Sequence, residues 1–374
     1  MLASLIAGNY LSTVQLSLNI IVILLAVVIS QSLFAAGLLW FAPTNRRSGR
    51  ILTVLITAIA LWLSDDFMRI GLIYRQRPNL YFLPIFYSFG FGPLIWFYLK
   101  SLIQQNFRFK RADLLHFIPV ALQAGLYFFL TFCSYPVKSW YWENVHRQYT
   151  YRIEFDGTWI SMTIYLVLSF RLLRHYQVWV ANNFSDLSRI RLNWLKVILG
   201  ILLLLCLQWF VEIILRDVYG VYFNYDYSVE ILGVIALVLG VAGLQQASLS
   251  EVSYEPESTV VYETDPAILE RISRSMEQDR LYLNPTLTLL ELSAALKLNS
   301  KIVSRHINVG FGKSFNDYVN SYRVEEVKRR LKSGDLAKLT IMGLAMESGF
   351  NSKTTFNRIF KSFTGHAPSE FITD

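Results

Sequence analysis

The chain has 374 residues, of which 53% are hydrophobic and only 17% are charged, and its formal net charge at pH 7 is +8. Soluble domains carry about 25% charged residues, so this composition, with a mean hydropathy of +0.37, argues against an ordinary soluble globular protein and favours several membrane spans. The two cysteines and five histidines have no metal-binding spacing, so we expect no metal site and no cofactor.

The charges divide the chain into three parts. Residues 1–249 hold 19 Lys and Arg and 11 Asp and Glu in mostly apolar sequence, and residues 250–265 hold five acids and no base. Residues 266–374 hold 16 bases and 11 acids. We therefore predict a transmembrane domain at 1–249, an acidic linker at 250–265 and a soluble basic domain at 266–374.

Seven apolar runs in residues 1–249 are near the length of about 20 residues that crosses a bilayer as a helix. The first run is too long for the hydrophobic core of a signal peptide, so we expect no cleavable signal. The prediction is an all-α protein that begins with a seven-helix transmembrane bundle. The runs are Val14–Phe41, Ile51–Tyr74, Leu80–Ile103, Leu114–Cys133, Trp159–Tyr176, Leu195–Leu215 and Val229–Leu249.

Lys and Arg in the connections between the runs predict the orientation of the bundle. The first, third and fifth connections hold twelve of these residues when Lys100, Arg171, Arg174 and Lys196 at the adjoining ends of the runs are included, and the second, fourth and sixth hold six. Connections rich in Lys and Arg stay in the cytoplasm. The N-terminus is therefore predicted outside and the basic C-terminal domain inside.

Several charged residues fall within or near the predicted spans. Charges in a bilayer are costly and commonly functional, so one interpretation is a pocket that binds a signal molecule from outside, and the other is a set of ion pairs that holds the bundle together. No nucleophile–base pair or phosphate-binding loop accompanies them, so we assign no catalytic residue and expect no enzyme. The candidate ligand-sensing residues are Asp65, Asp66, Arg69, Glu212, Arg216 and Glu230.

The C-terminal part contains a first helix-turn-helix pattern. Thr288 and Glu291 have the spacing of a capping box, which predicts a helix through Leu296. A tight turn at residues 298–300 follows, and Ser300 can cap a second helix to about Val309. A helix, a short turn and a second helix form a common DNA-binding unit.

The second helix of this pattern has an apolar and a polar face. Ile302, Val303 and Ile307 are predicted to face the core. Polar side chains on the opposite face can reach base edges in a major groove. These candidate DNA contacts are Lys301, Ser304, Arg305 and Asn308.

Two further helices are predicted around this pattern. The first, Pro266–Glu277, precedes it, and the second, residues 314–332, is long and carries apolar residues at helical spacing, with Gly334 as a stop signal. The long helix can hold two DNA-reading modules at a fixed distance.

The helix-turn-helix pattern then recurs. Thr340 can cap a helix over residues 341–348, residues 349–351 form a turn, and Ser352 can cap a second helix to about Phe363. Its predicted core residues are Phe356, Ile359, Phe360 and Phe363. Its candidate DNA contacts are Lys353, Thr354, Asn357, Arg358 and Lys361.

At these residues the sequence resembles the DNA-binding domain of AraC-type transcriptional regulators, the arabinose-regulator family. The motifs that carry the resemblance are Ser304-Arg305-His306-Ile307, Gly312-Lys-Ser-Phe315, Tyr322-Arg323, the run Ala345 to Lys361, and the run Phe363 to Phe371. The resemblance implies that Lys301 and Arg305, and then Thr354 and Arg358, occupy base-reading positions. The sequence departs from the family pattern at Ile307, Val327 and Thr354, which affects the expected target sequence.

The whole chain resembles membrane-bound AraC-type regulators with several spans. This implies a multi-pass protein of the bacterial inner membrane that couples a signal sensed at the membrane or its outer face to gene expression. The expected partners are double-stranded DNA through its major groove, the lipid bilayer and an unknown small-molecule or membrane signal, with RNA polymerase and a second copy of the chain as further candidates. Two alternatives stay open: a transporter or enzyme with an autoregulatory DNA-binding tail, and a structural tether between DNA and membrane.

Overall fold

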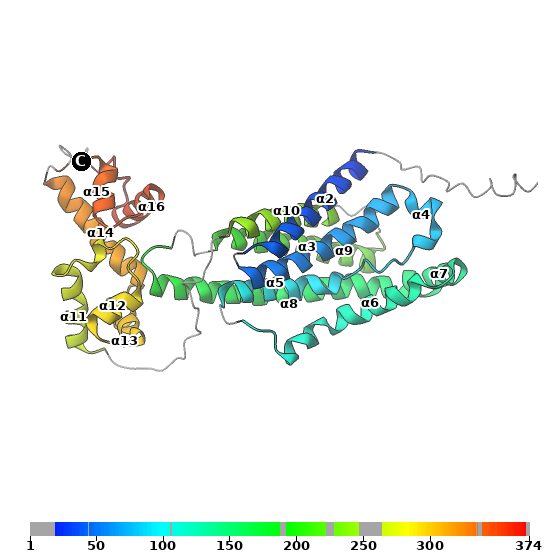
Figure 1. The fold of residues 1–374 in the computed structure, drawn as a ribbon, viewed down its shortest axis with the longest axis horizontal. Coiled ribbons are helices and arrows are strands. Elements are labelled where there is room, and N and C mark those ends of the chain that lie inside the picture. Colours follow the sequence, from blue (N-terminus) through cyan, green and yellow to red (C-terminus); the bar gives the residue numbers. More distant parts are fainter. Residues whose placement is uncertain are drawn as a thin grey trace, which may run out of the picture. The chain divides into compact units, whose positions relative to one another are not determined.

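A computed structural model describes residues 19–43, 45–104, 107–187, 192–221, 228–246, 264–333, 335 and 339–371. Helices dominate these ranges, and their extended pairing is limited to an isolated bridge between Phe184 and Thr288. The predicted all-α fold class is therefore confirmed for the described residues. The chain forms two compact units (Figure 1). Unit 1 comprises Met1–Leu173 and Asn193–Ser253, and unit 2 comprises Arg174–Leu192 and Tyr254–Asp374.

Seven helices of unit 1 follow the seven predicted apolar runs in chain order. They are α2 (Ile20–Phe41), α3 (Arg46–Ile70), α5 (Phe91–Ile103), α6 (Ile118–Thr131), α8 (Tyr151–Asn183), α9 (Asn193–Tyr219) and α10 (Ser228–Gln245). Short helices complete the described part of the unit. They are α4 (Ile73–Gln76), α7 (Tyr135–Tyr141), the 3-10 helices η1 (Pro78–Leu80), η2 (Ser88–Gly90) and η3 (Arg111–Phe117), and the π-helix η4 (Trp142–Thr150).

Four segments in the described ranges are long and apolar enough to cross a membrane, whereas seven were predicted. They are Ile20–Phe41, Arg46–Ile70, Arg111–Thr131 and Asn193–Tyr219. The apolar helix Glu230–Gln245 is shorter. The predicted fifth span lies inside α8, whose 33 residues include Glu154, Asp156, Arg171 and Arg174.

The third predicted span is wrong as a continuous helix. Within Leu80–Ile103, helix is limited to Leu80 at the end of η1, the one-turn η2 and the 13-residue α5, and residues 81–87 form no helix. Pro84 lies in that stretch and has no N–H to donate, and Phe82 has a φ of 61°. The apolar composition of the run therefore did not reveal the break.

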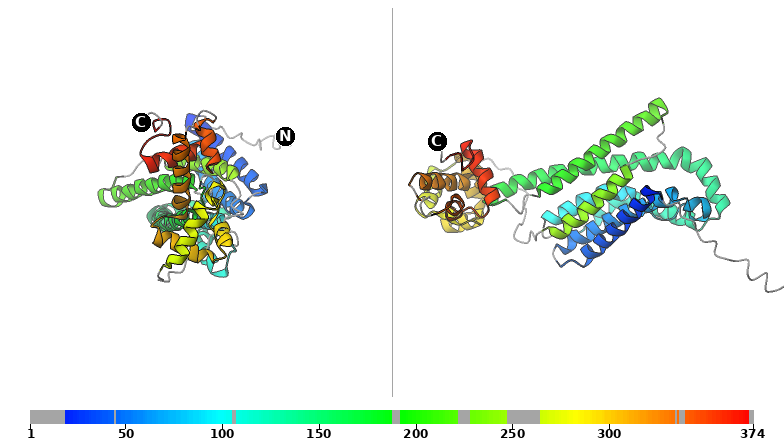
Figure 2. Two further views of the ribbon diagram at one scale, coloured as in Figure 1. Left: turned by 90° about the vertical axis from the view of Figure 1, so that its left-hand side faces the viewer. Right: turned by 90° about the horizontal axis from the view of Figure 1, so that it is seen from above.

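Small residues allow close packing within unit 1. Helix α3 packs against α2, α5 and α10 (Figure 2). A Cβ added to Gly243 of α10 would lie 2.6 Å from Cδ2 of Leu52, and one added to Gly240 would lie 2.9 Å from Cβ of Ala35. Helices that associate in lipid commonly meet at such small residues.

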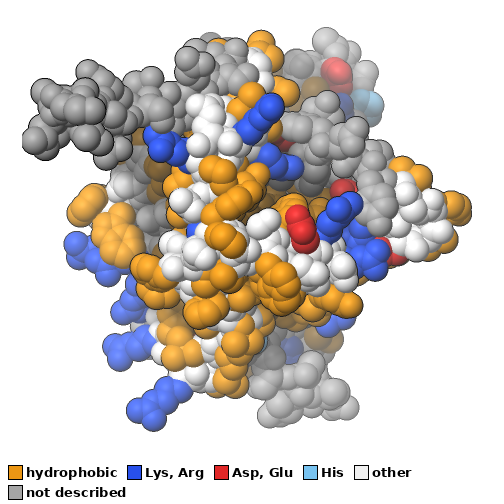
Figure 3. All heavy atoms as spheres, turned by 90° about the vertical axis from the view of Figure 1, so that its right-hand side faces the viewer, with side chains coloured by type: hydrophobic (Ala, Val, Ile, Leu, Met, Phe, Trp, Pro, Cys, Tyr) orange, Lys and Arg blue, Asp and Glu red, His pale blue; other side chains and the backbone are white. Residues whose placement is uncertain are grey.

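Large apolar side chains cover much of the surface of unit 1. Figure 3 shows them over the face that it draws, with Lys and Arg gathered mostly at its margins. In water such an extended apolar surface would favour aggregation, whereas lipid or a partner would cover it. Examples of exposed apolar residues are Ile20, Phe34, Leu122, Phe128, Phe129 and Leu204.

After the end of α8, the described residues of unit 2 form six α-helices. They are α11 (Pro266–Glu277), α12 (Leu289–Leu296), α13 (Ser300–Arg305), α14 (Phe315–Lys332), α15 (Ile341–Glu347) and α16 (Lys353–Thr364). The turn η5 (Leu281–Leu283) follows α11, and the π-helix η6 (His306–Gly310) continues α13. The prediction of two helix-turn-helix modules joined by a long helix is thus reproduced.

Each module has its own apolar core. The first contains Ile272, Leu292, Val303 and Ile307 among its buried residues, and it extends to Phe315 and Val319 of α14. The second is built around Phe356, Ile359 and Phe360 and includes Val324 and Val327 of α14. Because α14 contributes to both cores, it fixes one module to the other.

Some predictions lie outside the described residues. The start of the first apolar run, Gly334 and most of the acidic linker are among them. Asp265, the last residue of the predicted linker, is described: its side chain accepts a hydrogen bond from the N–H of Ala267 and caps α11.

Candidate nucleic-acid interface

Local hydrogen bonds position the helices of the first module. The Thr288 hydroxyl accepts from the N–H of Glu291, and the Glu291 carboxylate accepts from the N–H of Thr288, which confirms the capping box. Ser300 was predicted to cap α13, but the cap is Asn299. The Asn299 side chain accepts from the N–H of Lys301, and Ser300 is the first helical residue.

The exposed face of α13 differs from the predicted one at two positions. Lys301 is exposed and Arg305 half-buried, while Val303 and Ile307 are buried as predicted. Ser304, expected on the exposed face, is only 6% exposed.

The Ser304 side chain also has a partner within the module. The side-chain amide of Asn308, one turn further along, donates to the Ser304 hydroxyl at 3.4 Å. Ile302 was predicted to face the core and is 40% exposed. Both residues lie in the regular α-helical part of the module, before the π-helix that begins at His306.

Helix α16 presents the predicted polar face. Thr340 caps α15 and Ser352 caps α16, each by accepting a backbone N–H. Phe363 was predicted in the core and is 40% exposed, whereas Phe356, Ile359 and Phe360 are buried. The candidate DNA contacts Lys353, Thr354, Asn357, Arg358 and Lys361 are all exposed.

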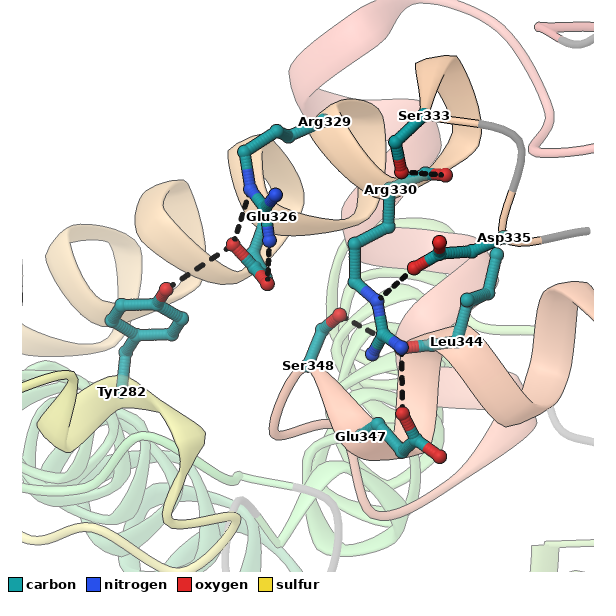
Figure 4. Close-up of polar contacts among 9 residues, drawn as sticks. All are labelled: Tyr282, Glu326, Arg329, Arg330, Ser333, Asp335, Leu344, Glu347 and Ser348. Atoms are coloured by element: carbon teal, nitrogen blue, oxygen red, sulfur yellow. Dashed lines mark hydrogen bonds and ion pairs between the residues drawn. The ribbon is translucent and has the colours of Figure 1, made fainter. Parts of the chain in front are cut away.

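Charged side chains of α14 tie it to both modules (Figure 4). Arg330 donates to Asp335 at 2.9 Å and to Glu347 of α15 at 2.7 Å. Glu326 lies 3.4 Å from the Tyr282 hydroxyl of the first module and pairs with Arg329. The polar contacts therefore reinforce the spacing that the two apolar cores set.

Arg323 of α14 is buried where several segments of unit 2 meet, and it is 2% exposed. Its Nε donates to the Tyr282 carbonyl at 2.8 Å and its Nη2 to the Asn284 carbonyl at 2.6 Å. A Cβ added to Gly349, in the turn of the second module, would lie 2.9 Å from its Nε. Burial lowers the pKa of Arg323 to about 10, so the guanidinium remains charged at neutral pH and is satisfied by hydrogen bonds.

A segment far away in the sequence completes this junction. We call Phe184–Leu187, which follows α8, the docking segment. The Ser185 hydroxyl donates to the Leu287 carbonyl at 2.6 Å and lies 3.2 Å from Nη2 of Arg323. No sequence signal marked this segment, because a short polar stretch after an apolar helix looks like a loop.

A second candidate site lies in unit 1. Side chains from α3, α4, α6, α8, α9 and the intervening turns line a cavity of about 350 Å³, which we call the aromatic cavity. Four of the six predicted ligand-sensing residues line it: Asp65, Asp66, Arg69 and Glu212. Residues distant in sequence are thus brought together.

The other two predicted residues are not among those that line the cavity. Arg216 of α9 lies 2.8 Å from the carboxylates of both Asp156 and Asp217, an arrangement that matches the ion-pair interpretation. Glu230 is half-buried at the start of α10. Sequence reasoning missed Glu154 of α8, which lines the cavity and accepts a hydrogen bond from the Tyr127 hydroxyl.

The paired modules of unit 2 define a double helix-turn-helix domain of the DNA-binding type. Residues 292–374 match the family model described as a helix-turn-helix domain. These residues therefore belong to an AraC-type helix-turn-helix domain, which confirms the resemblance seen in the sequence.

Curated relatives agree with this assignment. Uncharacterized HTH-type transcriptional regulators of Staphylococcus aureus, from strains COL and N315, are each 27% identical to the chain over 131 residues. The match covers 34% of this chain and 17% of each relative, so the chain spans about a sixth of the length of these relatives. No solved structure is significantly similar to the chain.

Proposed function

We propose that the chain is a membrane-bound, sequence-specific transcriptional regulator of the bacterial cytoplasmic membrane. The observation that carries this proposal is the pair of exposed polar helices, α13 and α16, whose modules share the rigid helix α14. Isolated helix pairs are common, but two matched modules with Lys and Arg on the second helix of each suit a DNA duplex.

The two modules would enter successive major grooves on one side of the duplex, about one turn apart. Lys301 and Arg305 would read bases from α13, and Thr354 and Arg358 from α16. Ser304 is buried, so it would contact DNA only after a local rearrangement of the module. Lys353, Asn357 and Lys361 would contribute phosphate or base contacts, with phosphates supplying affinity and base edges supplying sequence choice.

The membrane assignment rests on the four long apolar segments and on the exposed apolar side chains of unit 1. With seven crossings, the distribution of Lys and Arg places the N-terminus outside and the DNA-binding domain in the cytoplasm. In this topology the aromatic cavity lies in the outer half of the bundle.

A signal molecule would bind in unit 1 and change how two DNA-binding domains of a homodimer are presented to DNA and to RNA polymerase. Asp65, Asp66, Arg69 and Glu212 supply polar groups at the cavity. Arg216 and Glu230 lie outside the lining and would be affected indirectly, when the helices that carry them shift. A tenfold change in DNA occupancy requires about 1.4 kcal/mol of differential binding between the two states.

The proposal is tested in cells by crosslinking, isolation of the membrane fraction and sequencing of the DNA that co-purifies with the chain. Discrete genomic fragments should be enriched, and the double substitution Arg305→Ala and Arg358→Ala should abolish the enrichment. Arg274→Ala, on the exposed side of α11, is the matched control and should leave it intact. Uniform recovery of the genome would instead indicate a structural tether.

A further inference from the structure

We propose that the aromatic cavity of unit 1 binds a small organic cation, a primary amine or quaternary ammonium with a compact apolar body. This proposal deepens the proposed function, because the cation would be the signal. The cavity, at about 350 Å³, has the size of a small-molecule site.

Aromatic rings form most of the cavity wall. Ten of its 18 lining residues are Phe, Tyr or Trp. Ring faces attract cations through their quadrupole, and aromatic walls of this kind recognise quaternary ammonium groups. Trp62 and Phe155 each lie within 6.2 Å of the Trp209 ring, so rings from three helices approach one another here.

Charge around the cavity points to the same ligand class independently of the rings. Four carboxylates line it, from Asp65, Asp66, Glu154 and Glu212, against one guanidinium, that of Arg69. Arg69 already forms an ion pair with Asp66. The other three carboxyl groups offer hydrogen-bond acceptors to a cation, whereas an anion would find no second guanidinium among the lining residues.

Hydrogen bonds hold two of these carboxylates in place. The Tyr74 hydroxyl donates to Asp65 at 2.5 Å, and the Tyr127 hydroxyl donates to Glu154 at 2.9 Å. Side chains oriented in this way lose little freedom when a ligand binds. The two carboxyl groups are therefore already oriented to accept hydrogen bonds from a primary ammonium or to lie beside a quaternary ammonium.

The test uses the full chain in lipid nanodiscs and isothermal titration calorimetry. The probes are phenethylammonium and tetramethylammonium, with 2-phenylethanol and phenylacetate as the neutral and anionic counterparts of the first. We expect saturable binding of the ammonium probes, weakened about tenfold by Glu154→Gln, which replaces one carboxyl group of the lining. Glu143→Gln, at an exposed carboxylate of η4 outside the cavity lining, is the matched control and should bind like wild type.

Three results would overturn this proposal: no saturable binding of either ammonium by folded wild type, tighter binding of phenylacetate, or unchanged binding in Glu154→Gln. DNA binding is measured on the same preparation. If that protein binds DNA specifically but does not bind the ammonium probes, the ligand proposal fails while the proposed function stands. If the ammonium binds and DNA affinity never responds, the ligand class stands and the signalling role fails.

A different set of contacts, all within unit 2, carries a second inference. We infer that the docking segment Phe184–Leu187 sets the relative position of the two helix-turn-helix modules. It contacts the first module beside the cap of α12, where Phe184 forms its bridge with Thr288 and the Ser185 N–H donates to the Leu287 carbonyl at 3.2 Å.

The same segment reaches the long helix and the second module. Asn316 of α14 donates to the Ser185 carbonyl at 2.6 Å, and Arg323 donates to the Ser185 hydroxyl. Asn351, in the turn before α16, donates to the Asp186 carboxylate at 2.7 Å. Three residues of the segment, Phe184, Ser185 and Asp186, thus engage module one, module two and the helix that joins them.

Helix α8 connects this segment covalently to the membrane unit. Its first turns contribute Tyr151, Glu154, Phe155 and Thr158 to the wall of the aromatic cavity, and the docking segment begins directly after its last residue, Asn183. A ligand-induced shift of α8 would therefore move the docking segment against the two modules and change the distance between them.

The test compares the double variant Ser185→Ala and Asp186→Asn with wild type as full chains in nanodiscs. Each is titrated with a duplex selected by wild type, with its single half-sites, and with the full site lengthened by one base pair between the half-sites. Ser333→Ala, at an exposed serine whose hydroxyl donates to the Arg330 carbonyl, is the matched control.

We expect the double variant to lose about tenfold in affinity for the full site, to bind single half-sites like wild type, and to discriminate less against the lengthened site. A merely structural role would weaken full and half-sites together. That result, or unchanged discrimination between the two full-length sites, would overturn the inference.

Discussion

Nη2 of Arg323 lies 3.2 Å from the hydroxyl of Ser185, a residue 138 positions earlier in the chain. The buried cation of the long helix therefore depends on a segment that lies outside the helix-turn-helix modules themselves. This relationship makes the stability of the DNA-binding unit sensitive to the end of α8.

Replacing Arg323 with Met should destabilise unit 2. The carbonyls of Tyr282 and Asn284 and the Ser185 hydroxyl would lose a buried donor, at a cost of about 1–3 kcal/mol. Hydrogen exchange of the α14 amides measures this as a lower free energy of opening. Arg329→Met is the control, because its exposed ion pair with Glu326 contributes about 0–1 kcal/mol; equal effects of the two substitutions would contradict the buried role of Arg323.

Gly349→Ala should also destabilise the second module. Gly349 has a φ of 93°, and an added Cβ would lie 2.3 Å from the Tyr282 carbonyl oxygen. Gly312 has a φ of 63° with open space around it, so Gly312→Ala reports the backbone strain alone, about 1–3 kcal/mol. Gly349→Ala should exceed that value in denaturation experiments; the reverse order would show that the turn can open without loss.

Arg305→Ala or Arg358→Ala should each reduce specific DNA binding by about 1–3 kcal/mol. Fluorescence anisotropy of labelled duplexes with the full chain in nanodiscs measures the loss. Arg274→Ala, outside the predicted interface, should bind like wild type. Wild-type affinity in both interface variants would defeat the assignment of α13 and α16 as reading helices.

Asp66→Asn should reduce the response to the signal while the protein stays in the membrane. The substitution keeps the side-chain shape but weakens the ion pair with Arg69 at the cavity. A reporter gene under a bound promoter gives the readout, and immunoblots of the membrane fraction give the control. An unchanged response under every inducing condition would show that the aromatic cavity does not sense the signal.

Local features were predictable from the sequence because they depend on neighbouring residues. The capping pair Thr288 and Glu291, the cap at Ser352 and the bounds of α11 at Pro266–Glu277 all follow from short-range spacing. The burial of Ser304 and the exposure of Ile302 were missed because both residues lie at the boundary between the apolar and polar faces of α13, where tertiary packing decides which one is covered.

Long-range features were not predictable in the same way. Asp65 and Glu212 could be singled out as charges within or near apolar runs, but their common cavity and its aromatic wall arise from packing of α3 against elements far along the chain. The docking segment shows the same limit, since nothing near Ser185 in the sequence indicates a partner at Arg323.

Selection of bound duplexes from a random pool by the full chain in nanodiscs tests the central claim most directly. The account predicts enrichment of one sequence with two half-sites about one helical turn apart, and loss of that enrichment in the variant with both Arg305→Ala and Arg358→Ala. Recovery of duplexes without any shared sequence, by wild-type protein that binds DNA, would contradict it.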